Sequence, residues 1–301
     1  VALIYQDING DGTLTTQPFS TTRADGSFDL PQYTDISIPL ISSGGTDIST
    51  NTPAITLKGL INPNGPTILN PWTTFAVINT DTSGSATQTN INYNNSLQDL
   101  ANVFNVNVAD ITGDVIANQD KTTHEKQVQL VNTVKNIAIC IPSASVTSDS
   151  VINSFAKNIK AKANASMVVD MNVSSDISSI INQVENDSAL FVNPVIKTNV
   201  SSMVSEVNSS LSALDQTQSF DDLANESLQI SISGRIQLET LANLSSFNDA
   251  SFDVAANLST IVSNAQSVTV GNINQPELDE NGVAIVARSR QENKESESDI
   301  I

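Results

Sequence analysis

Apolar residues recur every three or four positions across most of this chain, from position 96 to about 267. One such stripe is Val151, Ile152, Phe155 and Ile159, and polar Asn, Ser, Gln or Asp side chains fall on the opposite face. This spacing gives each helix an apolar face that must be buried against other helices. We therefore expect an all-α bundle of about six to eight helices in this region.

The first 66 residues have a different pattern, in which short apolar runs are separated by turn residues. Ala2–Tyr5, Ile36–Ile41 and Ala54–Leu57 are such runs, and Gly, Asp and Pro lie between them. This pattern predicts a small antiparallel β-sandwich. The fold class expected for the whole chain is therefore α+β and multidomain. Its parts are a β-sandwich over residues 1–66, a helical bundle over residues 67–267 and a strand-like, charged C-terminal tail over residues 268–301.

Two helix starts can be predicted from capping residues. Asn70 followed by Pro71 is typical of an N-cap and a first helical position. The run Ser219–Asp222 has the pattern of a capping box. After the helix that begins near Pro71, the polar stretch Thr80–Asn95 is either a linker or an ordered surface loop, and the sequence leaves both interpretations open.

A cation-binding pattern lies near the start of the chain, in the run Asp7–Leu14. Side-chain oxygens of Asp7, Asn9 and Asp11 and the backbone carbonyl of Thr13 would supply about four of the six to eight oxygen ligands that calcium prefers. We expect Asp25 to supply a further one. The predicted metal ligands are therefore Asp7, Asn9, Asp11, Thr13 and Asp25, and the predicted cofactor is calcium.

This run is not an EF-hand, because Pro18 occupies the twelfth position, where an EF-hand carries a bidentate Glu. A second interpretation is a polar hairpin turn, since Asn-Gly and Asp-Gly are also strong hairpin signals. The two interpretations are compatible, because a turn that binds a cation is still a turn.

The same part of the chain resembles a known family. Ile4–Asp7 leads into the calcium run and Thr22–Phe28 follows it, which resembles the carboxypeptidase-regulatory-like or prealbumin-like β-sandwich modules of bacterial surface proteins. Ser43–Thr50 and Leu69–Phe75 also resemble such proteins, although Trp72 and Phe75 stand where leucines are usual. The resemblance covers about the first 75 residues, and it implies an extracellular module without enzymatic activity.

The resemblance also implies that a strand is missing. These modules usually have a further strand before the one that leads into the calcium run, whereas nothing lies upstream of Val1 in this sequence. We therefore expect an unpaired sheet edge that can accept a strand from another chain.

The charge of the chain restricts its partners. It has 32 acidic against 13 basic residues, a net charge of -19, which repels nucleic acid and anionic membranes and attracts divalent cations. We expect no nucleic-acid binding and no membrane insertion. Weak calcium sites are useful where calcium is millimolar, so we expect an extracellular, cell-surface location.

No catalytic motif is evident. The chain has a single histidine, His124, and a single cysteine, Cys140, so a two-histidine metal site and an internal disulfide are both excluded. Aromatic residues, which sugar-cleaving enzymes use to stack substrates, make up only 4% of the chain. We expect that the protein is not an enzyme.

Two functions from different classes remain. The first is a structural subunit of a calcium-stabilised surface filament, a head-to-tail homopolymer in which a strand of one subunit completes the sheet of the next. The expected donor strand is the apolar run Val283, Ala284, Ile285, Val286 and Ala287. The second is a module of a large cell-surface adhesin that binds a surface or glycan ligand, whose identity the sequence does not give.

Overall fold

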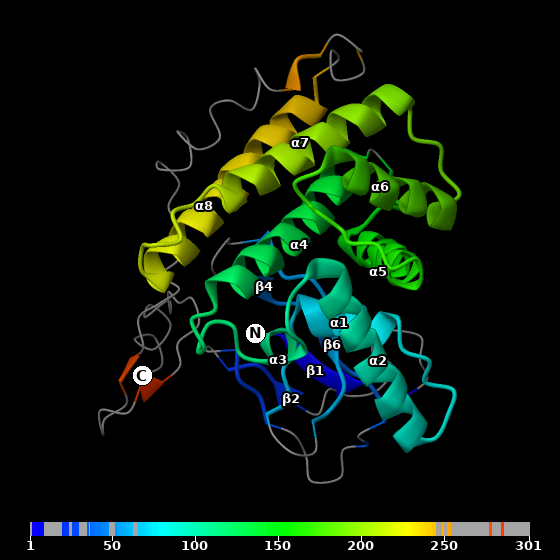
Figure 1. Cartoon of the computed structure of the whole chain (residues 1–301), viewed down its shortest axis with the longest axis vertical. Helices are drawn as coiled ribbons and strands as arrows, with labels where there is room; N and C mark the ends of the chain where they lie inside the picture. The colour runs from blue at the N-terminus through cyan, green and yellow to red at the C-terminus, as the bar shows by residue number, and fades with distance from the viewer. Residues whose placement is uncertain are drawn as a thin grey trace, which may run out of the picture.

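The computed structural model describes residues 2–8, 20–23, 26–29, 35, 37–47, 52–62, 66–141, 143–244, 249, 252–254, 277–278 and 284–285. Within these residues the protein is mostly helical, with eight helices and eight short strands. The strands near the N-terminus form one layer, and the helices lie against and above it (Figure 1).

The main sheet is small, open and antiparallel, with the strand order β2-β1-β3-β6. Its strands are β1 (Leu3–Gln6), β2 (Ser20–Thr21), β3 (Leu40–Ser43) and β6 (Leu57–Gly59). Two short ladders lie outside it, between β4 (Thr46–Asp47) and β5 (Thr52–Pro53), and between β7 (Glu277–Leu278) and β8 (Ala284–Ile285).

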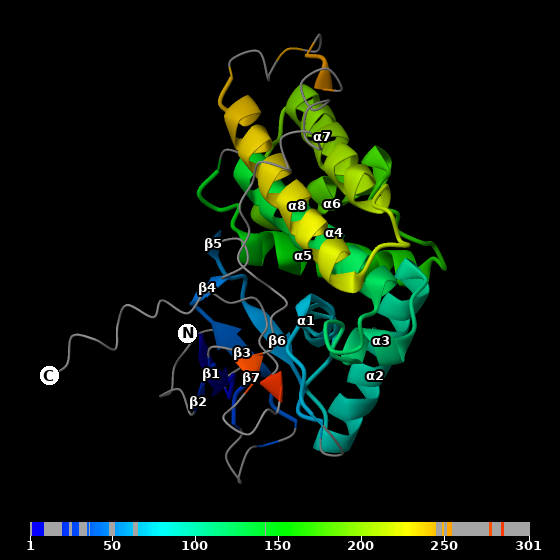
Figure 2. The ribbon, with the colours of Figure 1, turned by 90° about the vertical axis from the view of Figure 1, so that its left-hand side faces the viewer.

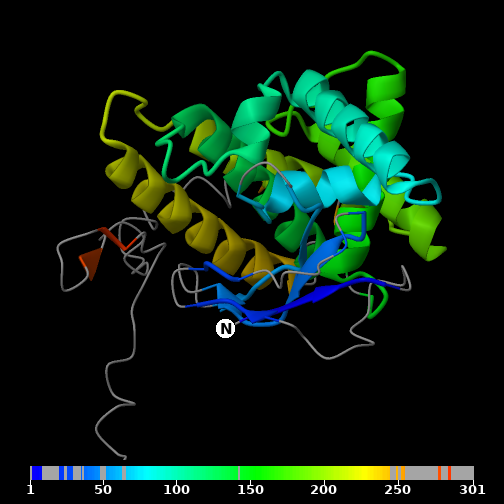
Figure 3. The same cartoon turned by 90° about the horizontal axis from the view of Figure 1, so that it is seen from below.

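The expectation of a β-sandwich followed by a helical bundle is wrong. In the described residues one four-stranded sheet is present, and a helix, α1, packs against β6 where a sandwich would place a second sheet (Figure 3). Part of the predicted strand Ala54–Leu57 is not in a strand, since residues 54–56 have no regular structure. The same turn residues flank strands and irregular extended segments, so the pattern does not distinguish the two and predicts too many strand residues.

The helices are α1 (Pro71–Ile78), α2 (Ala86–Phe104), α3 (Val108–Thr112), α4 (Lys121–Cys140), α5 (Ser148–Asn164), α6 (Ser174–Ser188), α7 (Pro194–Ser212) and α8 (Phe220–Ala242). Three of them, α4, α7 and α8, contact one another, while α5 packs on α2 and α6 (Figures 1 and 2). None of the helices in the described part of the chain is long and apolar enough to cross a membrane.

The predicted helix starts at Pro71 and near Ser219 are confirmed. The Asn70 side chain accepts a hydrogen bond from the Thr73 N–H at 2.8 Å, with Pro71 as the first helical residue. The Ser219 hydroxyl accepts from the Asp222 N–H at 3.1 Å and so caps α8. These side chains satisfy backbone donors that have no partner inside the first turn of a helix.

The first helix joins the sheet to the other helices. The Lys58 N–H of β6 donates to the Thr74 hydroxyl at 2.8 Å, and the Thr73 hydroxyl donates to the Lys58 carbonyl at 2.7 Å. The Asn70 amide then donates to the Ile111 carbonyl of α3 at 2.9 Å. The N-terminal turn of α1 is therefore hydrogen-bonded to a strand on one side and to a helix on the other.

The core is continuous from the end of β6 through the helices. Leu60, which follows β6, belongs to the same buried cluster as α1 and the helices after it. Four aromatic rings lie near its centre, from α1 (Trp72, Phe75), α2 (Phe104) and α5 (Phe155). Their edge-to-face contacts have ring centroids 5.2 Å apart for Trp72–Phe104 and 5.1 Å apart for Phe75–Phe155. Such pairs contribute about 0.5–1.5 kcal/mol beyond the burial of their surface.

Candidate functional site

The predicted calcium ligands are described only in part. Asp7 directly follows β1, and its backbone N–H donates to the Pro39 carbonyl at 3.1 Å. Asn9, Asp11, Thr13 and Asp25 lie outside the described residues. Among the described residues no group of three or more His, Cys, Asp or Glu side chains could hold a metal. Since four of the five predicted ligands are not among these residues, the calcium site stays a prediction.

The predicted donor run is also described in part. Ala284 and Ile285 form β8, which pairs antiparallel with Glu277 and Leu278 of β7, so strand character is confirmed for these two residues. Val283, Val286 and Ala287 lie outside the described residues. Exchange of this strand between subunits stays a prediction.

A polar cavity of about 470 Å³ lies between the sheet and the helices. Its walls come from the end of β1, the segment before β3, the strand β6, the C-terminal end of α1 with the residues after it, and α5. The described polar residues that line it are Asp7, Ser37, Lys58, Thr80, Thr82 and Asn153. A volume of this size is within the range of small-molecule sites, which is roughly 300–1,000 Å³.

The walls of this cavity are held by hydrogen bonds. The Asn79 amide donates to the Ala156 carbonyl at 2.8 Å, which fixes the end of α1 to α5. On the opposite wall, the Ser37 hydroxyl and N–H both donate to Asp35 Oδ1, at 2.7 and 2.8 Å. These bonds stabilise the carboxylate and lower the pKa of Asp35 below its ordinary value. The cavity is therefore bounded by segments whose backbone is already fixed.

Lys58 is the one basic residue among the described residues that line the cavity. Its backbone pairs with Ile41 of β3 and is bonded to Thr73 and Thr74 of α1. Its side chain is half-buried and forms no ion pair with the described residues. The described cavity wall thus has one basic residue, Lys58, and one acidic residue, Asp7, in a chain with a net charge of -19.

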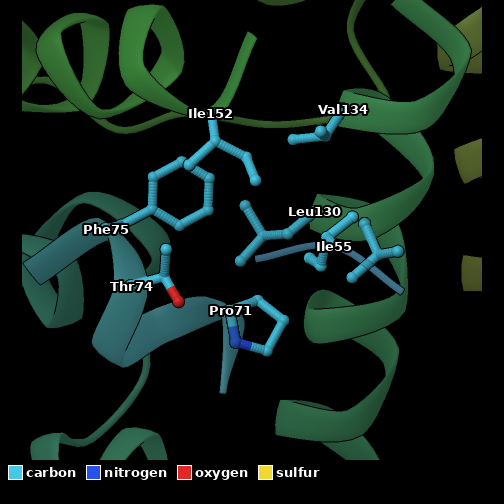
Figure 4. Close-up of a pocket in the computed structure, with 8 residues that line it drawn as sticks. Ile55, Pro71, Thr74, Phe75, Leu130, Val134 and Ile152 are labelled. Carbon is cyan, nitrogen blue, oxygen red and sulfur yellow. The ribbon is translucent and has the colours of Figure 1, made fainter. Parts of the chain in front are cut away.

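A second hollow is apolar and belongs to the packing of the core. It lies between the segment before β6, α1, α4 and α5, and it has no room for a water molecule. Figure 4 shows the side chains of Phe75, Leu130 and Ile152 pointing toward one another across it, with Ile55 beside Leu130. A crevice this narrow does not hold a ligand, and its role is to seal the sheet segment against the helices.

The single histidine forms a buried pair with a serine, but the hydrogen bonds of this pair are those of core packing and not of a serine nucleophile with its base. His124 Nε2 lies 3.1 Å from the Ser227 hydroxyl, while that hydroxyl donates to the Ala224 carbonyl at 2.8 Å. The serine proton is therefore used, and the histidine must donate to the serine oxygen. Burial lowers the pKa of His124 to about 4, and Phe220 packs edge-on against the ring. This neutral donor cannot act as a base toward Ser227.

The single cysteine lies inside the core. Cys140 ends α4 and is buried, and burial raises the pKa of its thiol to about 12. A thiol with so high a pKa carries almost no thiolate near neutral pH, and the thiolate is the reactive form. Cys140 therefore acts as a small apolar residue in this fold.

Sequence reasoning did not find the polar cavity. Lys58 and Asn153 have no motif around them, and Thr80 and Thr82 fall in a stretch interpreted as a linker or loop. The lining comes from segments more than a hundred residues apart, so no local spacing could indicate it. Asp7 is the exception, because it belongs both to the predicted calcium run and to the cavity wall.

Comparison with known proteins gives no relative for this chain. The resemblance to carboxypeptidase-regulatory-like modules thus rests on its residues alone and stays a hypothesis. No protein-family model, no curated protein and no solved structure matches the sequence or the fold.

Proposed function

We propose that this chain is a non-enzymatic structural protein of the cell surface, a subunit of a calcium-stabilised filament in which strand exchange joins the subunits head to tail. The observation that carries the proposal is the state of β8. It is extended, and within the described residues its ladder with β7 has just two residue pairs, Glu277–Ile285 and Leu278–Ala284. An isolated two-stranded ribbon is marginally stable in water, so moving β8 to another sheet costs little.

The open main sheet offers two ends for such a strand. At the β6 end, Lys58 forms a bridge with Asn70 and its N–H is used by Thr74, so α1 covers that edge. At the other end, β2 pairs with β1 through Thr21 and Ser20. We infer that a donor strand from the next subunit adds beside β2, because an edge strand presents backbone donors and acceptors for pairing.

The position of the predicted calcium run in the sequence also favours the β2 edge as the acceptor of the donor strand. Asp7–Leu14 lies in the connection between β1 and β2, since β1 ends at Gln6 and β2 begins at Ser20. Calcium bound there would hold the connection in one conformation and stiffen the edge that receives the donor. For a dissociation constant of about 0.1 mM in about 1 mM calcium, binding contributes about 1.4 kcal/mol to each subunit.

Electron microscopy of the purified chain in calcium, and again after chelation, tests the proposal. We expect regular fibres that shorten or fray in chelator. Deletion of residues 283–287 should abolish the fibres, whereas deletion of residues 293–297, an equal length of the charged run, should leave them intact. Isolated particles of the unaltered chain in both conditions would overturn the filament proposal and favour the adhesin module.

A further inference from the structure

The described lining of the polar cavity between the sheet and α1 includes no residue of the donor strand and shares one residue, Asp7, with the predicted calcium run. We propose that this cavity binds one hexuronate unit of a glycan, that is, a sugar ring that carries several hydroxyls and one carboxylate. The proposal goes beyond filament assembly, because ligand binding requires the cavity wall and not the donor strand.

The hydroxyls of the cavity favour a ligand that brings its own hydrogen-bond donors. The Ser37 hydroxyl gives its proton to Asp35, and the Thr80 hydroxyl gives its proton to the Ala76 carbonyl at 2.7 Å. Each oxygen therefore keeps lone pairs that can accept. The C-terminal end of α1, where backbone carbonyls collect partial negative charge, lies beside them. Sugar hydroxyls are donors of the required kind.

Lys58 provides the site for the carboxylate. Its backbone is fixed between β3 and α1, and within the described residues its ammonium has no carboxylate partner. Among the described lining residues Lys58 is the one basic side chain and Asp7 the one acidic one, so the wall can match at most one negative charge, placed at Lys58 and away from Asp7. A ligand with a dense negative charge is disfavoured, since the protein itself carries -19.

The remaining wall suits the apolar face of a sugar ring. Pro39 and Ile38 line the cavity on the sheet side, and Val77 and Ile78 line it on the helix side. Carbon-bound hydrogens of a pyranose ring can pack between such side chains while its hydroxyls face the polar groups. Binding sites of this kind combine an apolar lining with a few placed polar groups.

Isothermal titration calorimetry of the full chain with glucuronate, glucose and acetate tests this assignment. We expect saturable binding of glucuronate, and weaker or no binding of glucose, which lacks the carboxylate, and of acetate, which lacks the hydroxyls. Lys58→Gln should weaken glucuronate binding by about tenfold or more, because it removes a hydrogen bond to a charged group. Lys126→Gln, the same charge change on α4 away from the cavity, should bind as the unaltered chain does.

Several results would overturn the proposal. These are no saturable heat with glucuronate, equal binding of acetate and glucuronate, or unchanged affinity in Lys58→Gln. Thermal melts by circular dichroism show whether Lys58→Gln folds. The affinity of Asn153→Ala for glucuronate, changed at an exposed position of α5, gives a second test of the same wall. Fibres counted by microscopy on the same samples keep this result separate from filament assembly, since either can fail alone.

Discussion

Lowering the pH from 7 to 5 should destabilise this protein through one residue, His124. The folded protein holds its pKa at about 4, against an ordinary value of 6.5, because the ring is buried between α4 and α8. Asp120 acts in the opposite direction, but burial has the larger effect. Since the folded pKa is depressed, the unfolded chain takes up the proton first. The stabilising contribution is therefore complete above pH 6.5 and is lost as the pH falls toward 4.

The size of this effect follows from the difference between the two pKa values. Each unit of difference corresponds to about 1.4 kcal/mol. Between pH 7 and pH 5 the folded histidine stays almost entirely neutral, while the unfolded one becomes charged. The free energy of unfolding should therefore fall by about 2 kcal/mol in this interval because of His124 alone.

Urea unfolding at pH 7, 6 and 5 measures this loss, with His124→Gln as the comparison. Glutamine can still donate to Ser227 but cannot take up a proton. Between pH 7 and pH 5 the unfolding free energy of His124→Gln should therefore fall by about 2 kcal/mol less than that of the unaltered chain. The carboxylates titrate in both proteins and cancel in the difference. Because His124 is the only histidine, its proton resonance can also be titrated directly in the unaltered chain. A midpoint near 6.5, or identical pH dependence in the two proteins, would refute the reasoning.

Three further predictions concern packing, a buried amide and the metal. Gly234→Ala on α8 should lower the unfolding free energy by up to about 2 kcal/mol, because the added carbon would lie 2.7 Å from Val207 Cγ1 and overpacking exceeds the gain in helix propensity. Urea unfolding of Gly234→Ala, Val207→Ala and the double variant should give a favourable coupling, and strict additivity would contradict the contact. Asn136→Leu should raise the stability by about 1–3 kcal/mol, since Asn136 is fully buried and neither of its polar side-chain atoms has a partner among the residues that the structure describes; a lower melting temperature would instead indicate a buried water that bridges it. Asp7→Asn should abolish the calcium-induced rise in melting temperature, whereas Asp35→Asn should retain it, and an unchanged rise in Asp7→Asn would remove Asp7 from the calcium site.

Local signals in the sequence predicted parts of the helical region. The apolar stripe Val151, Ile152, Phe155 and Ile159 is buried on α5, as its spacing predicts. Asn70 and Ser219 cap helices because a short polar side chain satisfies a free backbone N–H. Such features depend on neighbours within about one helical turn, so they can be recognised without knowledge of the fold.

The polar stretch 80–95 was predicted wrongly for its second half, because α2 begins at Ala86. Its Asn and Thr residues have low helix propensity, and this composition suggested a linker or loop. Thr89 and Tyr93 are nevertheless buried one turn apart on α2, and burial against neighbouring helices outweighs propensity. The covering of the sheet by α1 and the polar cavity depend on the same kind of distant contact, which periodicity does not encode.

The bonds at the start of α1 have a mechanical consequence. Strand β6 and the helical region are linked there through Lys58, Thr73, Thr74 and Asn70. A force that pulls the sheet away from the helices would load these bonds, together with the core beside them and the hydrogen bond from Thr56 to Asp149 of α5. Because the bonds lie close together, they would share the load and break together. In single-molecule stretching, this junction would therefore set the rupture force at which the two parts of the protein separate.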